Sequence, residues 1–236
     1  MGTTLIGTEP ELLALLDDLL ADRGSAWWGD FYKDRAKPCP FFVEWPDENL
    51  MAWAGQGRLG AGRALELGCG NGRNAIFLAR HGFQVDAIDF SQKAIDWAAE
   101  RVRTTGADVR LQCRSIFDLA IEPGSFDLVY DTGCFHHIAP HRRPAYVSLV
   151  LQALRPGGRF GLVCFQTKAS SGFTDREVYE QRSLGGGLGF SDEQLRDFWG
   201  RYLNVLELRP MRKPSAEEGA FGEDFLWALL AQRRVG

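Results

Sequence analysis

The sequence predicts an α/β protein with a doubly wound, mostly parallel sheet of seven strands. Short apolar segments bounded by glycine or proline alternate with segments of helical periodicity between residues 63 and 165. Such alternation indicates βαβ crossovers, which place parallel strands side by side and cover both faces of the sheet with helices. The 236 residues contain no internal repeat and no interdomain linker, so we expect a single domain.

The first 58 residues are expected to form a helical and aromatic lid. A capping-box pattern at Thr8 and Glu11 begins a helix that is predicted to end near Asp22. An aromatic, turn-rich segment follows from Trp27 to Trp45, and a short helix is expected from Pro46 to Ala54.

Residues 63–165 are predicted to form the core of the domain. The strands are expected at 63–67, 84–88, 109–113, 127–130 and 159–165, and the helices at 73–81, 91–104 and 140–154. The Pro156-Gly157-Gly158 sequence predicts a turn before the last of these strands.

The C-terminal part combines a loop, a helix and two strands. Residues 168–190 are glycine-rich and lack a clear period, which predicts a mobile loop over the carboxyl edge of the sheet. In the segment 191–236, a capping box at Ser191 and Gln194 begins a helix to about Trp199. The strands predicted at 202–208 and 225–230 have the spacing of an antiparallel hairpin.

Composition excludes several functional classes. The 27 basic and 31 acidic side chains give a net charge of −4, which argues against a nucleic-acid surface. The five cysteines are scattered without a Cys-x-x-Cys pair, which favours a reducing compartment and argues against a metal site. No apolar run approaches ~18 residues, and the start of the chain lacks a signal-peptide pattern. We therefore expect a cytoplasmic protein without a membrane span.

The sharpest motif is the glycine-rich turn from Glu66 to Gly72, where a predicted buried strand meets a helix. Its third glycine comes two residues after the second, whereas a dinucleotide-binding turn needs three. About twenty residues later, the second predicted strand ends at Asp89, where a carboxylate can accept hydrogen bonds from two ribose hydroxyls. The pair of features predicts a nucleoside ligand.

These residues resemble the class I methyltransferases that use S-adenosylmethionine. The resemblance is strong from Arg63 to Phe165, and the run from Leu67 to Asn74 looks most like the tellurite-resistance and thiopurine methyltransferase branch. It implies a Rossmann-like fold and S-adenosyl-L-methionine as cofactor. It also implies that Glu66 and the glycines hold the methionine part, that Asp89 holds the ribose and that Phe90 packs on the adenine.

By this resemblance, sixteen residues are expected to contact the cofactor. They are Trp28, Tyr32, Glu66, Gly68, Cys69, Gly70, Asn71, Arg73, Asn74, Asp89, Phe90, Ser115, Ile116, Asp131, Thr132 and Gly133.

The motif after the third strand departs from the family. An acidic residue usually receives the adenine amino group there, and Ser115 stands at the matching position. Ser115 could accept that hydrogen bond, the backbone N–H of Ile116 could contact the ring, or Asp118 could reach in. A solvent-facing turn is the alternative.

The fourth motif follows the strand at 127–130 and supplies the catalytic candidates, Asp131 and His136. Its position places Asp131 to Gly133 beside the expected methyl group. One member of the His136-His137 pair could act as a general base or orient the acceptor, because imidazole titrates near neutrality. We expect His136 to face the site and His137 to point elsewhere, although a histidine packed under the next helix is the alternative.

Two further segments are expected near the ligands. Trp28 and Tyr32 resemble the aromatic cover of several methyltransferases, where a sulfonium beside aromatic rings gains about 0.5–2 kcal/mol. The alternative is that these rings bury the first helix. Tyr179 and Arg182 are candidates for contacting the substrate, and solvated loop residues are the alternative.

The resulting hypothesis is methyl transfer by in-line displacement to a small-molecule acceptor, such as a thiol, selenol or other heteroatom nucleophile. A tRNA base methyltransferase is the first alternative, because the aromatic residues from Trp28 to Phe42 loosely resemble the cover of one such branch. A cofactor-binding regulator without turnover is the second.

Overall fold

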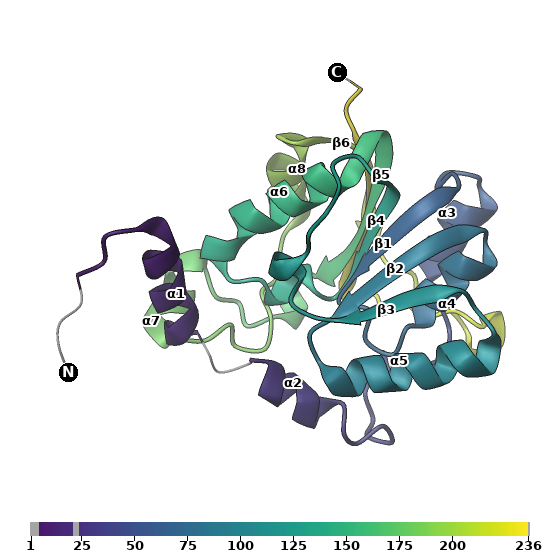
Figure 1. Ribbon diagram of the computed structural model, residues 1–236, viewed down its shortest axis with the longest axis horizontal. Coiled ribbons are helices and arrows are strands. Elements are labelled where there is room, and N and C mark those ends of the chain that lie inside the picture. The colour runs from purple at the N-terminus through teal and green to yellow at the C-terminus, as the bar shows by residue number, and fades with distance from the viewer. Residues whose placement is uncertain (1–4, 21–23, 236) are drawn as a thin grey trace.

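A seven-stranded sheet forms the centre of the protein, as the ribbon of the computed structural model shows (Figure 1). The structure describes residues 5–20 and 24–235. The strands are β1 (Gly62–Leu67), β2 (Phe83–Asp89), β3 (Val109–Cys113), β4 (Phe126–Thr132), β5 (Leu154–Phe165), β6 (Leu203–Pro210) and β7 (Leu226–Arg233).

The strand order β3-β2-β1-β4-β5-β7-β6 confirms the predicted fold class. The first five strands pair in parallel, and β7 pairs antiparallel to both β5 and β6. The chain passes from β1 outward to β2 and β3, then returns to β4 on the other side of β1. Ligands of doubly wound sheets bind beyond the carboxyl ends of the strands at such a reversal, here between β1 and β4.

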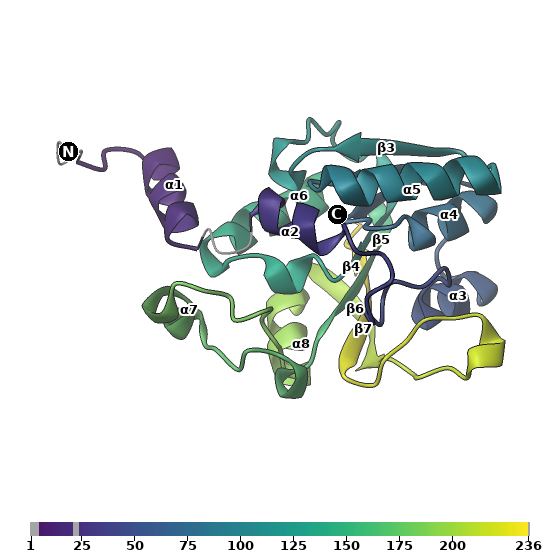
Figure 2. The same ribbon diagram turned by 90° about the horizontal axis from the view of Figure 1, so that it is seen from below.

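Helices cover both faces of the sheet (Figure 2). The described α-helices are α1 (Glu9–Leu19), α2 (Ser25–Phe31), α3 (Glu48–Gly55), α4 (Arg73–Arg80), α5 (Gln92–Thr105), α6 (Arg143–Ala153), α7 (Asp175–Gln181) and α8 (Asp192–Gly200). One apolar cluster lies between the sheet and α6 and α8, and a second lies between the sheet and α3, α4 and α5. In β5, Leu162 belongs to the first cluster and Val163 to the second, because successive strand residues face opposite sides.

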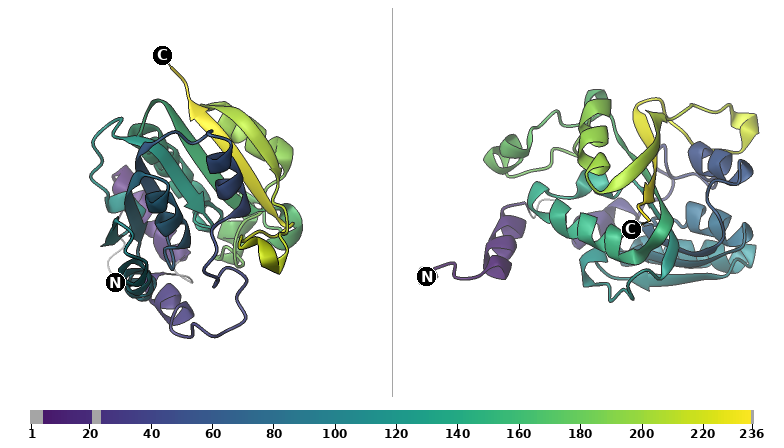
Figure 3. Two further views of the ribbon diagram at one scale, coloured as in Figure 1. Left: turned by 90° about the vertical axis from the view of Figure 1, so that its right-hand side faces the viewer. Right: turned by 90° about the horizontal axis from the view of Figure 1, so that it is seen from above.

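The first helix stands away from the sheet layers and contacts the domain at its C-terminal end (Figure 3). Its capping box is confirmed: the Thr8 hydroxyl accepts from the Glu11 amide, and the Glu11 carboxylate accepts from the Thr8 amide. The Asp17 carboxylate pairs with Arg142 and with His141, the latter at 2.8 Å. The helix had been expected to reach Asp22, which lies outside the described residues.

Two segments differ from the sequence-based expectations. The expected turn at 156–158 lies inside β5, which begins at Leu154 and accommodates the glycines through a register shift against β4. The expected loop at 168–190 contains α7, a helix of seven residues that is too short to produce a visible period. Its capping box, formed by Thr174 and Glu177, was the available signal.

None of the described helices has the length and apolar character needed to cross a bilayer.

Candidate functional site

A cavity of about 640 Å³ opens at the carboxyl ends of β1 and β4. Its walls come from the turn after β1, the ends of β2 and β3, the turn after β4, and the aromatic segment that includes α2. This volume lies within the ~300–1,000 Å³ typical of small-molecule sites. Fifteen of the sixteen expected cofactor residues line it; the exception is Asp131.

The glycine turn after β1 packs closely against neighbouring segments, which only residues without a side chain allow. Gly68 and Gly70 have φ angles of +68° and +53°, which side chains rarely adopt. A Cβ on Gly68 would lie 2.9 Å from the Cβ of Cys134, and one on Gly70 would lie 2.9 Å from the Tyr32 hydroxyl. The turns after β1 and β4 therefore meet closely, with the Tyr32 hydroxyl beside them.

Asp89 connects the end of β2 to the glycine turn. Its Oδ2 accepts from the Gly70 amide at 2.9 Å, and its Oδ1 accepts from the Ser91 amide at 2.8 Å. Burial raises the pKa of Asp89 to about 6, against the opposing effect of these amide donors. Each carboxylate oxygen can accept more than one hydrogen bond, so Asp89 retains capacity for ligand hydroxyls.

Glu66 presents an uncompensated acceptor to the cavity. Its Oε2 is buried and has no hydrogen-bond partner among the described residues. Burial raises the pKa of this carboxyl to about 8, and nearby Arg73, with hydrogen bonds from the Ala75 backbone and the Asn74 side chain, only partly offsets that effect. A buried carboxylate with one oxygen left unpaired is costly, so a cationic ligand group would be stabilised here. The ammonium group of the methionine part of S-adenosylmethionine fits this position.

A buried polar network lies beneath the glycine turn, and sequence reasoning missed its centre, Asp47. The carboxylate of Asp47 forms an ion pair with Arg73 at 2.5 Å and accepts hydrogen bonds from Tyr130 at 2.6 Å, from Thr132 and from Asn74 at 3.1 Å. The Asp47 amide donates to the Asn74 Oδ1 at 2.9 Å.

Three residues that were expected to contact the cofactor form hydrogen bonds with residues 43–47 instead. Arg73 also donates to the Trp45 carbonyl, and Asn71 donates to the Val43 carbonyl at 3.0 Å. These bonds, with those between Asn74 and Asp47, tie residues 43–47 to the glycine turn. Asn71, Arg73 and Asn74 line the cavity, but their hydrogen-bonding groups fix this segment.

The turn after β3 places Ser115, Ile116 and Phe117 on the cavity wall, whereas Asp118 does not line it. The Ser115 hydroxyl accepts from the Phe117 amide at 3.2 Å and caps the short 3₁₀ turn. Phe90, which is 40% exposed, lines the same cavity.

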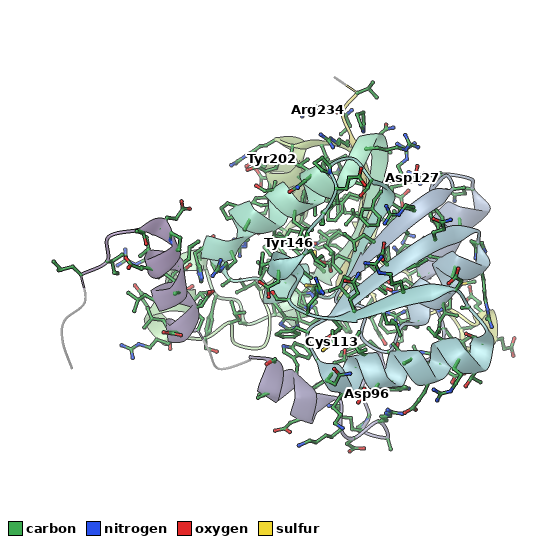
Figure 4. All side chains as sticks on the ribbon, in the orientation of Figure 1. Asp96, Cys113, Asp127, Tyr146, Tyr202 and Arg234 are labelled. Atoms are coloured by element: carbon green, nitrogen blue, oxygen red, sulfur yellow. The ribbon has the colours of Figure 1, made fainter. Side chains whose placement is uncertain are left out.

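Asp131 is not in contact with the cavity, which corrects its expected catalytic and cofactor-binding roles. Its Oδ1 accepts from the Cys134 and Phe135 amides at 2.8 and 3.3 Å, and its Oδ2 accepts from the Tyr146 hydroxyl at 2.5 Å. Tyr146, labelled in Figure 4, belongs to α6 and to the apolar cluster between that helix and the sheet. The side chain is fully buried, and burial raises its pKa to about 7. Asp131 thus positions the turn that carries the histidines.

Both histidines line the cavity, so the expectation that only one could face it is wrong. They lie on the 3₁₀ turn Phe135–His137, and their ring centroids are 4.4 Å apart. The His137 ring meets Trp28 edge to face at 4.9 Å. The His136 ring stacks on Phe165 at 3.8 Å and 11°, and its Nδ1 accepts from the Phe165 amide at 3.3 Å.

Aromatic side chains form the remaining wall. Trp28 and Tyr32 line the cavity as expected, and four further aromatic residues of the same segment join them. These four are Trp27, Phe31, Phe41 and Phe42. Phe31 stacks on both Trp27 and Phe41, and Tyr32 stacks on Phe42 at 5.3 Å. The clustering of seven aromatic residues between 27 and 45 was the signal for this wall.

Tyr179 and Arg182, the expected substrate contacts, do not line the cavity. The Tyr179 hydroxyl is bonded to the amide and Nδ1 of His141, both at 3.0 Å, below α1. Arg182 is exposed and ends α7 in the left-handed conformation, with φ of 51°. Leu184 and Gly186 of the same segment line the cavity instead.

Comparisons with known proteins agree with this geometry. Residues 64–158 match the model of a methyltransferase domain family. An uncharacterized methyltransferase from Synechocystis sp. is 33% identical over 123 residues, which cover 52% of this chain and 53% of that protein. The chain therefore spans about half the length of this relative.

Two further similarities extend over more of the chain. A 2-heptyl-1-hydroxyquinolin-4(1H)-one methyltransferase from Mycobacteroides abscessus is 24% identical over 80% of this chain and 78% of its own length. The crystal structure of 1,6-didemethyltoxoflavin-N1-methyltransferase from Burkholderia thailandensis, with S-adenosylhomocysteine bound, is 19% identical. It aligns with a TM-score of 0.60 over 99% of this chain and 93% of that one, which shows a shared fold.

The matched family model, the strand order and the glycine turn with its two buried carboxylates support a class I S-adenosylmethionine-dependent methyltransferase domain around residues 64–158. S-adenosylmethionine is the cofactor of this class.

Proposed function

We propose that the chain transfers a methyl group from S-adenosylmethionine to a heteroatom of a small, largely apolar molecule, such as a thiol, a selenol or another heteroatom nucleophile. One observation carries the proposal: a single cavity joins the glycine turn after β1 to an aromatic wall. Donor and acceptor molecules can therefore lie in contact within one space.

The residues divide the cavity into two ends. Glu66 would hold the ammonium group, Asp89 the ribose hydroxyls, and Phe90 with Ile116 the two faces of the adenine. The Ser115 hydroxyl would meet the adenine amino group. When bound, the cofactor supplies an electrophilic methyl group on a sulfonium, and the backbone from Thr132 to Gly133 would lie beside it.

The other end is suited to an apolar acceptor. Its wall includes Trp28, Phe31, Phe165 and Leu184. These side chains exclude water and align the acceptor lone pair with the methyl carbon at ~3–3.5 Å, which is the main requirement of an in-line displacement. The thiols of Cys69 and Cys134 also line the cavity, and burial raises their pKa well above the ordinary value, so they stay neutral and do not compete as nucleophiles.

The rim supports a small molecule over an RNA base as the acceptor. Asp18 lines the cavity, the charge of Asp17 is already paired with Arg142, and the chain has a net charge of −4, which disfavours a phosphate backbone. No observation favours the RNA or the regulatory alternative. The five free cysteines support a reducing, cytoplasmic setting.

A defined acceptor panel tests the proposal. We would measure S-adenosylhomocysteine release with thiophenol, benzeneselenol, a phenol and a hydroxyquinolone, each against free cysteine and unmodified tRNA. We expect faster release with at least one aromatic acceptor than with cysteine. Methylation of the tRNA in preference to every small acceptor would refute the proposal.

A further inference from the structure

The environment of His136 determines which of its two ring nitrogens carries the proton. The Phe165 amide donates to Nδ1 at 3.3 Å, so Nδ1 has to present a lone pair. In a neutral imidazole the proton then resides on Nε2. Nδ1 is therefore the acceptor, and Nε2 is the donor.

Packing holds the ring in this orientation. It stacks on Phe165, and the His136 carbonyl accepts from the Leu188 amide at 2.8 Å. A Cβ on Gly187 would lie 3.2 Å from the ring Cδ2, so the ring edge abuts this glycine. Nε2 lies near Gly133, where a Cβ would be 3.9 Å from it, on the cavity wall beside the turn after β4.

The charge state agrees with this geometry. Burial lowers the pKa of His136 well below its ordinary value, and the adjacent His137 disfavours a positive charge further. A cationic ring would also need a proton on Nδ1, which would confront the Phe165 N–H. His136 therefore stays neutral, and its Nε2 has no lone pair with which to remove a proton.

We propose that His136 contacts the methyl acceptor as a hydrogen-bond donor through Nε2–H and does not act as a general base. Its preferred acceptors then carry a carbonyl oxygen, ring nitrogen or similar hydrogen-bond acceptor next to the atom that receives the methyl group. This inference rests on the proposed function for the identity of the bound molecule, whereas the tautomer depends on the fold alone.

Nitrogen NMR of the protein labelled with ¹⁵N-histidine tests the tautomer without any substrate. The chain has four histidines, and the resonance lost in His136→Gln identifies the one of interest, with His81→Gln as an exposed-site control. We expect a neutral Nε2–H ring that does not titrate between pH 5.5 and 8.5, with and without S-adenosylhomocysteine. An Nδ1–H tautomer, or titration in this range, would overturn the proposal.

Binding of two matched probes to the S-adenosylhomocysteine complex tests the contact. Methyl 2-sulfanylbenzoate carries a carbonyl beside the thiol, whereas thiophenol does not. We expect the ester to bind about five- to tenfold more tightly, as for one hydrogen bond. This preference should persist in His136→Gln, which keeps a donor, and disappear in His136→Leu. An equal preference in the wild-type protein and His136→Leu would contradict the contact. If neither probe binds, the proposed acceptor class is wrong, and the NMR result still decides the tautomer.

Discussion

The Gly70 amide donates to the Asp89 Oδ2 at 2.9 Å and so joins the turn after β1 to the end of β2. The cofactor-binding turn and the proposed ribose carboxylate are thus parts of one hydrogen-bonded unit. Asp89→Ala should weaken S-adenosylhomocysteine binding by at least about 100-fold, because two hydrogen bonds to a charged group contribute about 1.5–3 kcal/mol each. Calorimetric titration would measure the dissociation constant of S-adenosylhomocysteine for both proteins.

Asp96→Ala, on the outer side of α5, is the matched control and should leave the affinity unchanged. Thermal unfolding of both variants would show that any loss comes from binding. Unaltered affinity in a folded Asp89→Ala protein would remove Asp89 from the ribose role.

Glu66 should make cofactor affinity depend on pH. Its pKa is raised to about 8 by burial, and an ammonium ligand favours the charged carboxylate, so binding releases a proton below that pH. The dissociation constant of S-adenosylhomocysteine should therefore fall as pH rises from 6.5 to 8, by up to about tenfold per unit. Glu66→Gln should bind more weakly at pH 8 and lose this slope. The same slope in both proteins would show that Glu66 does not hold the ammonium group.

We expect Asp131 to affect turnover by holding in place the turn that carries His136. Asp131→Asn keeps an oxygen for the Cys134 and Phe135 amides and should retain most activity, whereas Asp131→Ala releases the turn that carries His136. We expect the alanine variant to lose turnover by about 10²-fold, as for small displacements of a substrate-positioning group, with little change in cofactor affinity. A loss of turnover in Asp131→Asn as large as that in Asp131→Ala would instead indicate a chemical role for the carboxylate.

The same residue should contribute to the pH dependence of stability. Burial raises the folded-state pKa of Asp131 to about 7, above an unfolded value of ~3.9, so the folded state binds the extra proton. Its contribution is complete below the unfolded pKa and is lost as pH rises towards 7. Urea unfolding at pH 5 and pH 8 should show a smaller decrease in unfolding free energy for Asp131→Asn than for the wild-type protein. Equal decreases would contradict the raised pKa.

The buried ion pair between Asp47 and Arg73 should be important for folding. Arg73→Ala leaves the fully buried Asp47 carboxylate without its cationic partner and should cost about 3–5 kcal/mol in urea unfolding. Arg35→Ala removes a surface pair with Glu100 and should cost no more than ~1 kcal/mol. A similar cost for both variants would mean that the network does not hold residues 43–47.

The sequence was sufficient for the fold and for most of the residues that line the cavity at the glycine turn, because both depend on local signals. Alternating strands and helices indicated the sheet, and the glycine turn with Asp89 indicated the ligand edge. The role of Asp47 was not predictable, because its partners Arg73 and Tyr130 are 26 and 83 residues away and meet it only after the sheet forms.

Asp131 and Tyr179 show a second limit of prediction from the sequence alone. A polar side chain at the carboxyl edge of a sheet can point into a cavity or beneath it, and the motif is the same in both cases. Only the position of α6, which brings Tyr146 to Asp131, distinguishes the two outcomes. In the same way, the Tyr179 hydroxyl meets His141, which also contacts Asp17 of α1, and these long-range contacts leave no local signal in the sequence.

The most direct test of the central claim is to incubate the protein with methyl-labelled S-adenosylmethionine and a cell extract separated into small molecules, RNA and protein. We expect label in the small-molecule fraction, in a compound that partitions into organic solvent, and no transfer by Asp89→Ala. Label confined to RNA or protein, or no label despite measured cofactor binding, would contradict it.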